Sequence, residues 1–167
     1  MTDNARGAAL IAAILAAALQ AGVYFAFSVS VMPGLALGDD RTFVAAMQQM
    51  NVAIYNPWFM VTFFGAPLLA ALASVLSLGG ANRPVLLWAV LGFLFAAITV
   101  LITAAVNVPL LNALDADGDP DQIADLAGVR AAFESAWTRW NTVRAVTSTL
   151  GVGALALALM AHGRGTS

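Results

Sequence analysis

Four long apolar runs leave this chain of 167 residues few ways to fold. They cover residues 7–37, 58–78, 85–106 and 145–161. A helix needs about 20 residues to cross a hydrocarbon core of about 30 Å, and the first three runs reach that length. The fourth run reaches it once residues 142–144 are included. The mean hydropathy is +0.86 and only 10% of the residues are charged, which excludes an ordinary soluble bundle, because its helices would still need polar faces.

We therefore predict an all-α polytopic membrane protein with one domain over residues 1–167. Four spanning helices are expected at about 8–32, 57–78, 85–106 and 142–162, packed as a bundle with two short extramembrane helices. The first apolar run is too long for the apolar part of a signal peptide, so it is expected to remain as a helix. Prolines should end two of these helices, the first at Met32-Pro33-Gly34 and the third at Pro109.

The first extramembrane helix is predicted at about residues 41–55, with Asp39 and Asp40 as caps. It is too short and too polar to span, so it should lie on the bilayer surface or fold over the bundle as a lid. The second is predicted to begin at Asp119 as N-cap, with Pro120 in its first turn. The aspartates of the loop before it lack the register of a calcium-binding loop, so this loop is expected to be solvated.

Composition limits the chemistry that this chain can perform. A net charge of -2 gives no sign of nucleic-acid binding, and the absence of cysteine rules out disulfides and thiolate chemistry. The single histidine, His162, follows the last apolar run, and the motifs of soluble enzymes are missing. We expect no metal ion and no other cofactor. The expected partners are the lipid bilayer and a flat apolar small molecule, and a homo-oligomer is left open.

Polar residues inside the first and third runs recur at i, i+4 and i+8, so each set forms one helical stripe. Membrane helices turn such residues toward protein or water rather than lipid. Hydrogen bonding between helices is the better interpretation for Gln20, whereas contact with a ligand is an equal alternative for Tyr24 and Ser28. The stripes consist of Gln20, Tyr24 and Ser28 and of Thr99, Thr103 and Asn107.

A cluster of aromatic, amide and cationic residues precedes the fourth run. Trp137, Trp140, Asn141 and Arg144 share one helix face, whereas Arg139 falls on another. Such a stripe can bind an anionic or aromatic group, or it can simply lie at the level of the lipid headgroups. A buried guanidinium needs partners, and we expect those of Arg144 to be carbonyls and amides in the segment 107–112.

Four motifs follow one another along the chain in a distinctive order and spacing. They are Phe27-Ser28-x-x-Val31-Met32-Pro33-Gly34-Leu35, Ala46-Met47-Gln48-x-x-Asn51 with Asn56-Pro57-x-Phe59, Asn107-Val108-Pro109-Leu110-x-Asn112-x-Leu114, and Trp137-x-x-Trp140-Asn141-x-x-Arg144. In this combination the chain resembles the anthrone oxygenase-like family of small four-helix membrane proteins. The resemblance runs from the first spanning helix to the fourth, and it implies the same fold.

The resemblance also implies an activity, because some members oxidise anthrones to anthraquinones with O₂ and without metal or flavin. The predicted function is thus a cofactor-independent, O₂-dependent oxidation of an anthrone-like aromatic polyketide. Stabilisation of an enolate oxygen makes Asn107, Asn141 and Arg144 the candidate catalytic residues. The candidate ligand-binding residues are Tyr24, Ser28, Asn51, Asn56, Asn112, Trp137 and Trp140. No conventional base is evident, so enolate formation would depend on electrostatics, water or Tyr24.

A second hypothesis belongs to a different class: a non-catalytic membrane subunit, or a protein that binds lipid or another hydrophobic ligand. The Trp137–Arg144 cluster would then only anchor the helix at the membrane interface. In either case, the segments 51–57, 107–112 and 137–144 lie on the same side of a four-span bundle, so we expect them to form one pocket. The arginine count of the two sides is nearly equal, and we predict a cell-membrane protein with both termini cytoplasmic.

Overall fold

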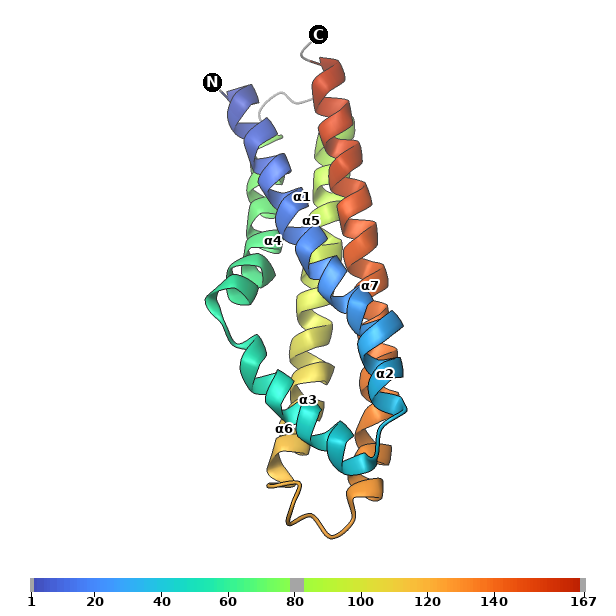
Figure 1. Ribbon diagram of the computed structural model, residues 1–167. Coiled ribbons are helices and arrows are strands. Elements are labelled where there is room, and N and C mark those ends of the chain that lie inside the picture. Colours follow the sequence, from blue (N-terminus) through green and yellow to red (C-terminus); the bar gives the residue numbers. More distant parts are fainter. Residues whose placement is uncertain (1, 79–82, 166–167) are drawn as a thin grey trace.

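The computed structural model describes residues 2–78 and 83–165, in which helices are joined by short turns and no strand occurs. Four helical stretches are long and apolar enough to cross a membrane: Asp3–Ala36, Pro57–Leu76, Arg83–Ala116 and Leu126–Gly165. They run side by side, and both termini lie at the same end of the bundle (Figure 1). The predicted all-α architecture with four membrane-length helices is confirmed.

The four helices form a closed ring. Helix α1 (Thr2–Ala26) packs against α4 (Pro57–Leu76) and α7 (Leu126–Gly165), and α5 (Arg83–Ile102) packs against the same two helices. Helices α1 and α5 therefore lie diagonally opposite each other. This arrangement leaves one central space that side chains from all four helices can fill.

Small residues fill that space at the end that holds both termini, which we call the closed end. Alanine lets helix backbones approach closely, because its side chain is a single methyl group. Gly92 of α5 is needed for the same reason, since a Cβ there would lie 2.6 Å from Cγ of the buried Leu155 on α7. The alanines of this core are Ala9, Ala13, Ala16, Ala17, Ala66, Ala70, Ala73, Ala89 and Ala158.

Arg6 completes the closed end, although only 7% of its surface is exposed. Its Nε and Nη2 donate to the carbonyl oxygen of Leu76 at 3.1 and 3.0 Å, and its Nη1 lies 3.1 Å from Oδ1 of Asp3. The carbonyls of the last turn of a helix have no partner within the helix. Arg6 therefore caps the C-terminus of α4 and has an acid to balance its charge.

Two π-helical segments interrupt the bundle helices. Segment η1 (Phe27–Val31) joins α1 to α2 (Met32–Ala36), and η2 (Thr103–Asn107) joins α5 to α6 (Val108–Ala116). In both, the backbone N–H after the segment bonds to the carbonyl of the segment's first residue, five positions back.

The prediction that Pro33 and Pro109 end their helices is therefore wrong. Each proline is the second residue after a π-helical segment, and the helix continues beyond it. Proline lacks an N–H and crowds the carbonyl four residues earlier, which disrupts a regular α-helix. The wider turn of a π-helical segment relieves both problems, so the helix survives the proline.

Helix α3 (Asp40–Ile54) covers the end opposite the closed end (Figure 1), which we call the cavity end. Its position agrees with the predicted short helix, and Oδ1 of Asp39 accepts a hydrogen bond from the Thr42 N–H at 2.7 Å. Its buried face packs against α2, α6 and α7. Helix α3 therefore folds over the bundle as a lid, which was one of the two predicted alternatives. That face consists of Phe43, Val44, Met47 and Asn51.

The second predicted short helix is not a separate element. Asp119 and Pro120 belong to a turn, in which Oδ1 of Asp119 accepts from the Asp121 N–H at 2.9 Å. An Asp-Pro pair suits a tight turn as well as a helix start, so the pair alone could not distinguish them. Helix α7 begins at Leu126, where Asp125 accepts from the Gly128 N–H, and it continues for 40 residues to Gly165.

Arg130 near the start of α7 holds the cavity end together. Its guanidinium donates to the carbonyls of Ala36 and Gly38 and contacts the carboxylates of Asp40 and Glu134 at 3.0 and 2.7 Å. These contacts fasten the connection between α2 and α3 to α7. The lid helix is thereby fixed at its N-terminal side.

Candidate functional site

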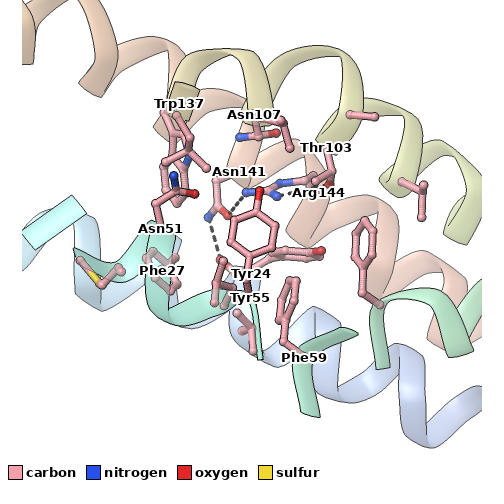
Figure 2. A pocket seen from close by; sticks show the side chains of 18 of the residues that line it. Tyr24, Phe27, Asn51, Tyr55, Phe59, Thr103, Asn107, Trp137, Asn141 and Arg144 are labelled. Atoms are coloured by element: carbon pink, nitrogen blue, oxygen red, sulfur yellow. Dashed lines mark hydrogen bonds between the residues drawn. The ribbon is translucent and has the colours of Figure 1, made fainter. Parts of the chain in front are cut away.

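A cavity of about 310 Å³ lies between the alanine core and α3. This volume is at the lower end of the range of about 300–1,000 Å³ that is typical of small-molecule sites. Its walls come from α1, η1, α3, α4, α5, η2, α6 and α7. Most of the lining is aliphatic or aromatic; polar side chains of α1, η2 and α7 lie close together, and Asn51 of α3 lies beside Trp137 (Figure 2).

The polar side of the cavity lies one membrane thickness from the closed end. Three arginines mark the closed end, one on each of three helices, and a rise of 1.5 Å per residue converts sequence separation into depth. The polar residues then lie about 27–30 Å away, close to the thickness of a hydrocarbon core of about 30 Å. The pairs compared are Arg6 with Tyr24, Arg83 with Thr103, and Arg164 with Arg144.

Arg144 is the central charge of the site, and only 5% of its surface is exposed. Its Nη2 donates to Oδ1 of Asn141 at 3.0 Å, and its Nη1 donates to Oγ1 of Thr103 at 3.3 Å. Its guanidinium carbon lies 4.4 Å from the ring centre of Tyr24 and 5.6 Å from that of Trp137. Aromatic faces attract a cation, so they recover part of its desolvation cost.

The partners of Arg144 differ from the prediction. They lie on α1, η2 and α7, and none belongs to the predicted segment 107–112, because that segment continues as a helix and its backbone acceptors are used within it. The salt bridges of residues 2–78 and 83–165 involve Arg6, Arg41 and Arg130, and none involves Arg144. The described chain therefore leaves this buried positive charge without an acid.

Asn141 connects Arg144 to α1. Its Nδ2 donates to the carbonyl oxygen of Tyr24 at 2.9 Å and to Oγ of Ser28 at 2.8 Å, while its Oδ1 accepts from Arg144. Both polar atoms of the Asn141 amide group are thus hydrogen-bonded, and these three hydrogen bonds fix the orientation of the amide. Asn141 is therefore well suited to hold the guanidinium in place.

Several buried polar atoms at the cavity have no hydrogen-bond partner among the described residues. They include Nδ2 and Oδ1 of Asn107, which is fully buried, Nε1 of Trp137 and Nε of Arg144. Asn51 donates to Oδ2 of Asp115 at 2.5 Å, but its own Oδ1 is also unpartnered. Buried polar atoms are almost always satisfied in proteins, so atoms that converge on one cavity indicate a polar ligand or water there.

Aromatic rings form two facing walls. On one side, Phe27 and Trp137 line the cavity with ring centres 5.5 Å apart. On the other, Phe59 and Phe63 of α4 stack at 5.7 Å with planes only 14° apart. Such surfaces favour a flat aromatic ligand, because ring faces and edges complement one another.

The structure brings most of the predicted site residues together. As expected, the segments 51–57, 107–112 and 137–144 contribute to one cavity. The predicted residues that line it are Tyr24, Asn51, Asn107, Trp137, Asn141 and Arg144.

The other predicted residues lie outside the cavity lining. Ser28 contacts Asn141 instead, and Asn56 caps α4 by accepting from the Phe59 N–H at 3.0 Å. Asn112 is exposed on α6. Trp140 is half-buried, because at about 100° per residue it lies about 60° to one side of Trp137 on the helical wheel.

The phenylalanine wall of α4 was not predicted. Phe59 and Phe63 are one helical turn apart, but they lie in a run where lipid-facing and cavity-facing side chains are equally apolar. Thr103 was noted only as part of a stripe. Throughout the described ranges, no three His, Asp or Glu side chains come together as a metal site.

Fold and site together define a membrane-helix bundle with a buried, aromatic-walled cavity beside Arg144, an arginine with no acid partner among the described residues. Residues 58–154, more than half of the chain, match the anthrone oxygenase family, so this chain belongs to that family. The matched segment includes Asn107, Trp137, Asn141 and Arg144. Comparison with curated proteins and with solved structures gave no match.

Proposed function

We propose that this protein binds an anthrone-like aromatic polyketide in the cavity and oxidises it with O₂ without a cofactor. The observation that carries the proposal is the buried guanidinium of Arg144, which has no acid partner in the described chain and lies on the wall of an aromatic cavity. A fixed cation in a water-poor site stabilises a developing oxyanion strongly.

The chemistry requires little from the protein. The methylene carbon of the anthrone loses a proton, and the enolate transfers an electron to O₂ and then forms a C–O bond with it. Protonation gives a hydroperoxide, and loss of water across its C–H and O–O bonds leaves the second carbonyl. The carbon loses four electrons in total, and O₂ ends as one carbonyl oxygen and one water molecule.

The geometry supports a role for each of these residues. Arg144 and the unpartnered amide of Asn107 would bind the oxyanion, and this charge would make the methylene acidic enough for water to accept its proton. Trp137 and the stacked Phe59 and Phe63 would hold the rings. Helix α3 would keep bulk water away from the enolate.

The second candidate is a protein that binds a hydrophobic ligand without chemistry, alone or as a membrane subunit. It is favoured by the absence of any carboxylate or imidazole among the described residues that line the cavity. The same cavity would then serve a molecule with an acceptor oxygen, held by Arg144 and Asn107.

The proposed location is the cell membrane, with both termini in the cytoplasm. Arg6, Arg83 and Arg164 lie at the closed end, which fits the tendency of basic residues to remain on the cytoplasmic side. Accessibility of a terminal tag in sealed cells, before and after permeabilisation, tests this orientation.

Oxygen consumption tests the proposed reaction. The protein in lipid nanodiscs should convert a dihydroxyanthrone to the anthraquinone with one O₂ consumed per product, at the same rate with and without chelator. Arg144→Met should return the rate to that of empty nanodiscs. Equal rates for the wild type, Arg144→Met and empty nanodiscs would rule out catalysis, and tight binding with no oxidation would favour the second candidate.

A further inference from the structure

The cavity is open on one side, between α4 and η2. Helix α4 packs along α1 and α5 but makes no extensive backbone contact with η2 or α6. Two cavity-lining residues that border this gap are exposed, Phe64 of α4 at 52% and Ala104 of η2, and Tyr55 in the connection before α4 is 60% exposed. A residue that both lines a cavity and is exposed marks the opening of that cavity.

This opening extends from the edge of the hydrocarbon layer into the layer. At 1.5 Å per residue, Phe64 lies about 10 Å along α4 from Pro57, and Ala104 lies about 31 Å along the third span from Arg83. Trp58, which is 86% exposed, lies beside the opening at the start of α4. Exposed aromatic residues of this kind are typical of the membrane interface.

The two sides of the opening are apolar. On α4, the ring centres of Phe63 and Phe64 are 5.0 Å apart in an edge-to-face arrangement, next to the stacked pair of Phe63 with Phe59. The facing surface consists of Val100 and Ala104, which are one turn apart. A flat aromatic molecule can pass between these apolar surfaces without breaking any side-chain hydrogen bond.

The side of the cavity that faces water is fastened by hydrogen bonds instead. Gln48 of α3 donates to the carbonyls of Leu114 and Gly118, both at 2.9 Å, and Asn51 donates to Asp115. Arg130 fixes the start of α3 to α7. Access from water would break these bonds, whereas access from lipid only displaces apolar contacts.

We infer that the ligand reaches the cavity sideways from the lipid leaflet, through a portal between α4 and η2 that is bordered by Phe63, Phe64, Val100 and Ala104. The ligand class is a flat, apolar or weakly amphiphilic aromatic molecule dissolved in the membrane, and this class rests on the proposed function. The portal does not depend on the reaction, so it can be tested without a substrate.

The chain has no cysteine, so a single reporter thiol can be introduced cleanly. Val23 lines the cavity from α1, diagonally opposite α5, and Val23→Cys places the reporter beyond the portal. The probe is pyrene maleimide, a flat aromatic reagent that dissolves in bilayers, applied to the protein in nanodiscs. A charged, membrane-impermeant maleimide serves as the aqueous probe.

Pyrene maleimide should label Val23→Cys at least about tenfold faster than the charged reagent. Adding Ala104→Trp should slow pyrene labelling about tenfold by filling the portal. Ala105→Trp is the matched control, because Ala105 is the next exposed alanine of η2 and does not line the cavity. It should leave labelling within about twofold. Val100→Phe, which narrows the same portal, replaces Ala104→Trp if that variant does not fold.

Three results would overturn the portal. One is no labelling of Val23→Cys by pyrene maleimide in folded protein. Another is equal slowing by Ala104→Trp and Ala105→Trp. The third is labelling by the charged reagent that is as fast as pyrene labelling. A portal that passes this test while the oxygen measurement fails leaves the route intact and removes only the proposed chemistry.

Discussion

Two buried arginines, one at each end of the bundle, have almost the same exposure and opposite surroundings. Arg6 at the closed end is 7% exposed and has an acid and a helix-end carbonyl as partners. Arg144 at the cavity end is 5% exposed and has two neutral hydrogen-bond partners and two aromatic faces. Arg6 therefore has an acid and a carbonyl that satisfy it, whereas Arg144 has no acid partner among the described residues and lines the cavity.

The packing around the two arginines differs in the same way. Alanines bring the helices close together at the closed end. At the cavity end, phenylalanine, tryptophan and methionine keep the helices apart, and the π-helical segments place Phe27, Thr103 and Asn107 on the cavity wall. The comparison indicates that the site lies where the helices pack less closely and where a buried charge has no acid partner among the described residues.

The largest expected effect comes from the same substitution made at both ends. Arg144→Met should lower anthrone turnover about 10²- to 10³-fold, as loss of an oxyanion-stabilising group does, while the melting temperature changes little because an unpaired buried charge is removed. Arg6→Met should lower the melting temperature, because it leaves the Leu76 carbonyl and the Asp3 carboxylate without their partner. It should leave turnover nearly unchanged. Oxygen uptake and thermal unfolding in detergent measure the two effects. Equal losses in both assays for both variants would refute the contrast.

Closeness of packing at the closed end gives the next largest effect. Gly92→Ala should lower the free energy of unfolding by about 1–3 kcal/mol, because the new Cβ would lie 2.6 Å from Cγ of Leu155. Gly153→Ala on α7 is the matched control, since a Cβ there has nothing within 4 Å. It should be neutral or stabilising, because alanine favours helix by up to about 1 kcal/mol. Equal melting temperatures for the two variants would contradict the tight packing.

A milder change tests whether Arg144 acts by its shape as well as its charge. Arg144→Lys keeps the charge but cannot reach both Thr103 and Asn141 with a planar fork. Binding of a dihydroxyanthraquinone should weaken about tenfold, or about 1.4 kcal/mol. Arg139→Lys, on an exposed face of α7, should bind like the wild type. If titration gives the same affinity for both variants, Arg144 is only an interfacial anchor.

Helical periodicity was enough to predict the polar half of the site. Trp137, Asn141 and Arg144 recur at 4 and 3, and the stripe through Asn107 recurs at 4, so their shared faces could be read from the sequence. Asn51 was predicted as a ligand-binding residue from its place in a motif rather than from periodicity. In a four-span topology these faces can only meet at one end of the bundle.

Periodicity could not predict the apolar half of the site or the shape of the helices. An inward phenylalanine such as Phe63 and an outward one such as Phe25 look alike in a uniformly apolar run, because lipid removes the polar face that marks the outside of a soluble helix. Pro33 favoured the end of a helix. Whether the helix ends there or widens into a π-helical turn depends on the side chains that pack against it. Asn56 and Asn112 show that an amide near a site in sequence can be a cap or an exposed residue.

The lid should respond more weakly than either core. Gln48→Ala removes two hydrogen bonds from α3 to the α6 end, each worth about 0.5 kcal/mol net at this partly exposed position. Amide hydrogen exchange in α3 should become several-fold faster, while exchange at the closed end stays unchanged. Gln49→Ala is the control, because Gln49 is exposed on the same helix. Equal exchange in the two variants would show that these bonds do not hold the lid.

The smallest expected effect is a pH dependence confined to the first turn of the lid. The hydrogen bond from the Thr42 backbone N–H lowers the pKa of the Asp39 carboxyl below its ordinary value. A lowered pKa in the folded state means that the cap stabilises α3 above the unfolded pKa of about 3.9. This contribution disappears as the pH falls through the lower folded value. Asp39→Asn keeps a good cap that does not titrate, so it is the matched control.

Near neutral pH, the first-turn amides of α3 in the wild type and in Asp39→Asn should therefore exchange at similar rates. At about pH 3, below the unfolded pKa of about 3.9, the wild type should exchange faster than the variant at Thr42 and Phe43. The comparison at each pH cancels the intrinsic effect of pH on exchange. Helix α4 is the internal reference, because Asn56 caps it with a side chain that does not titrate. A wild type that keeps the same protection as Asp39→Asn at low pH would show that the Asp39 cap does not stabilise the lid.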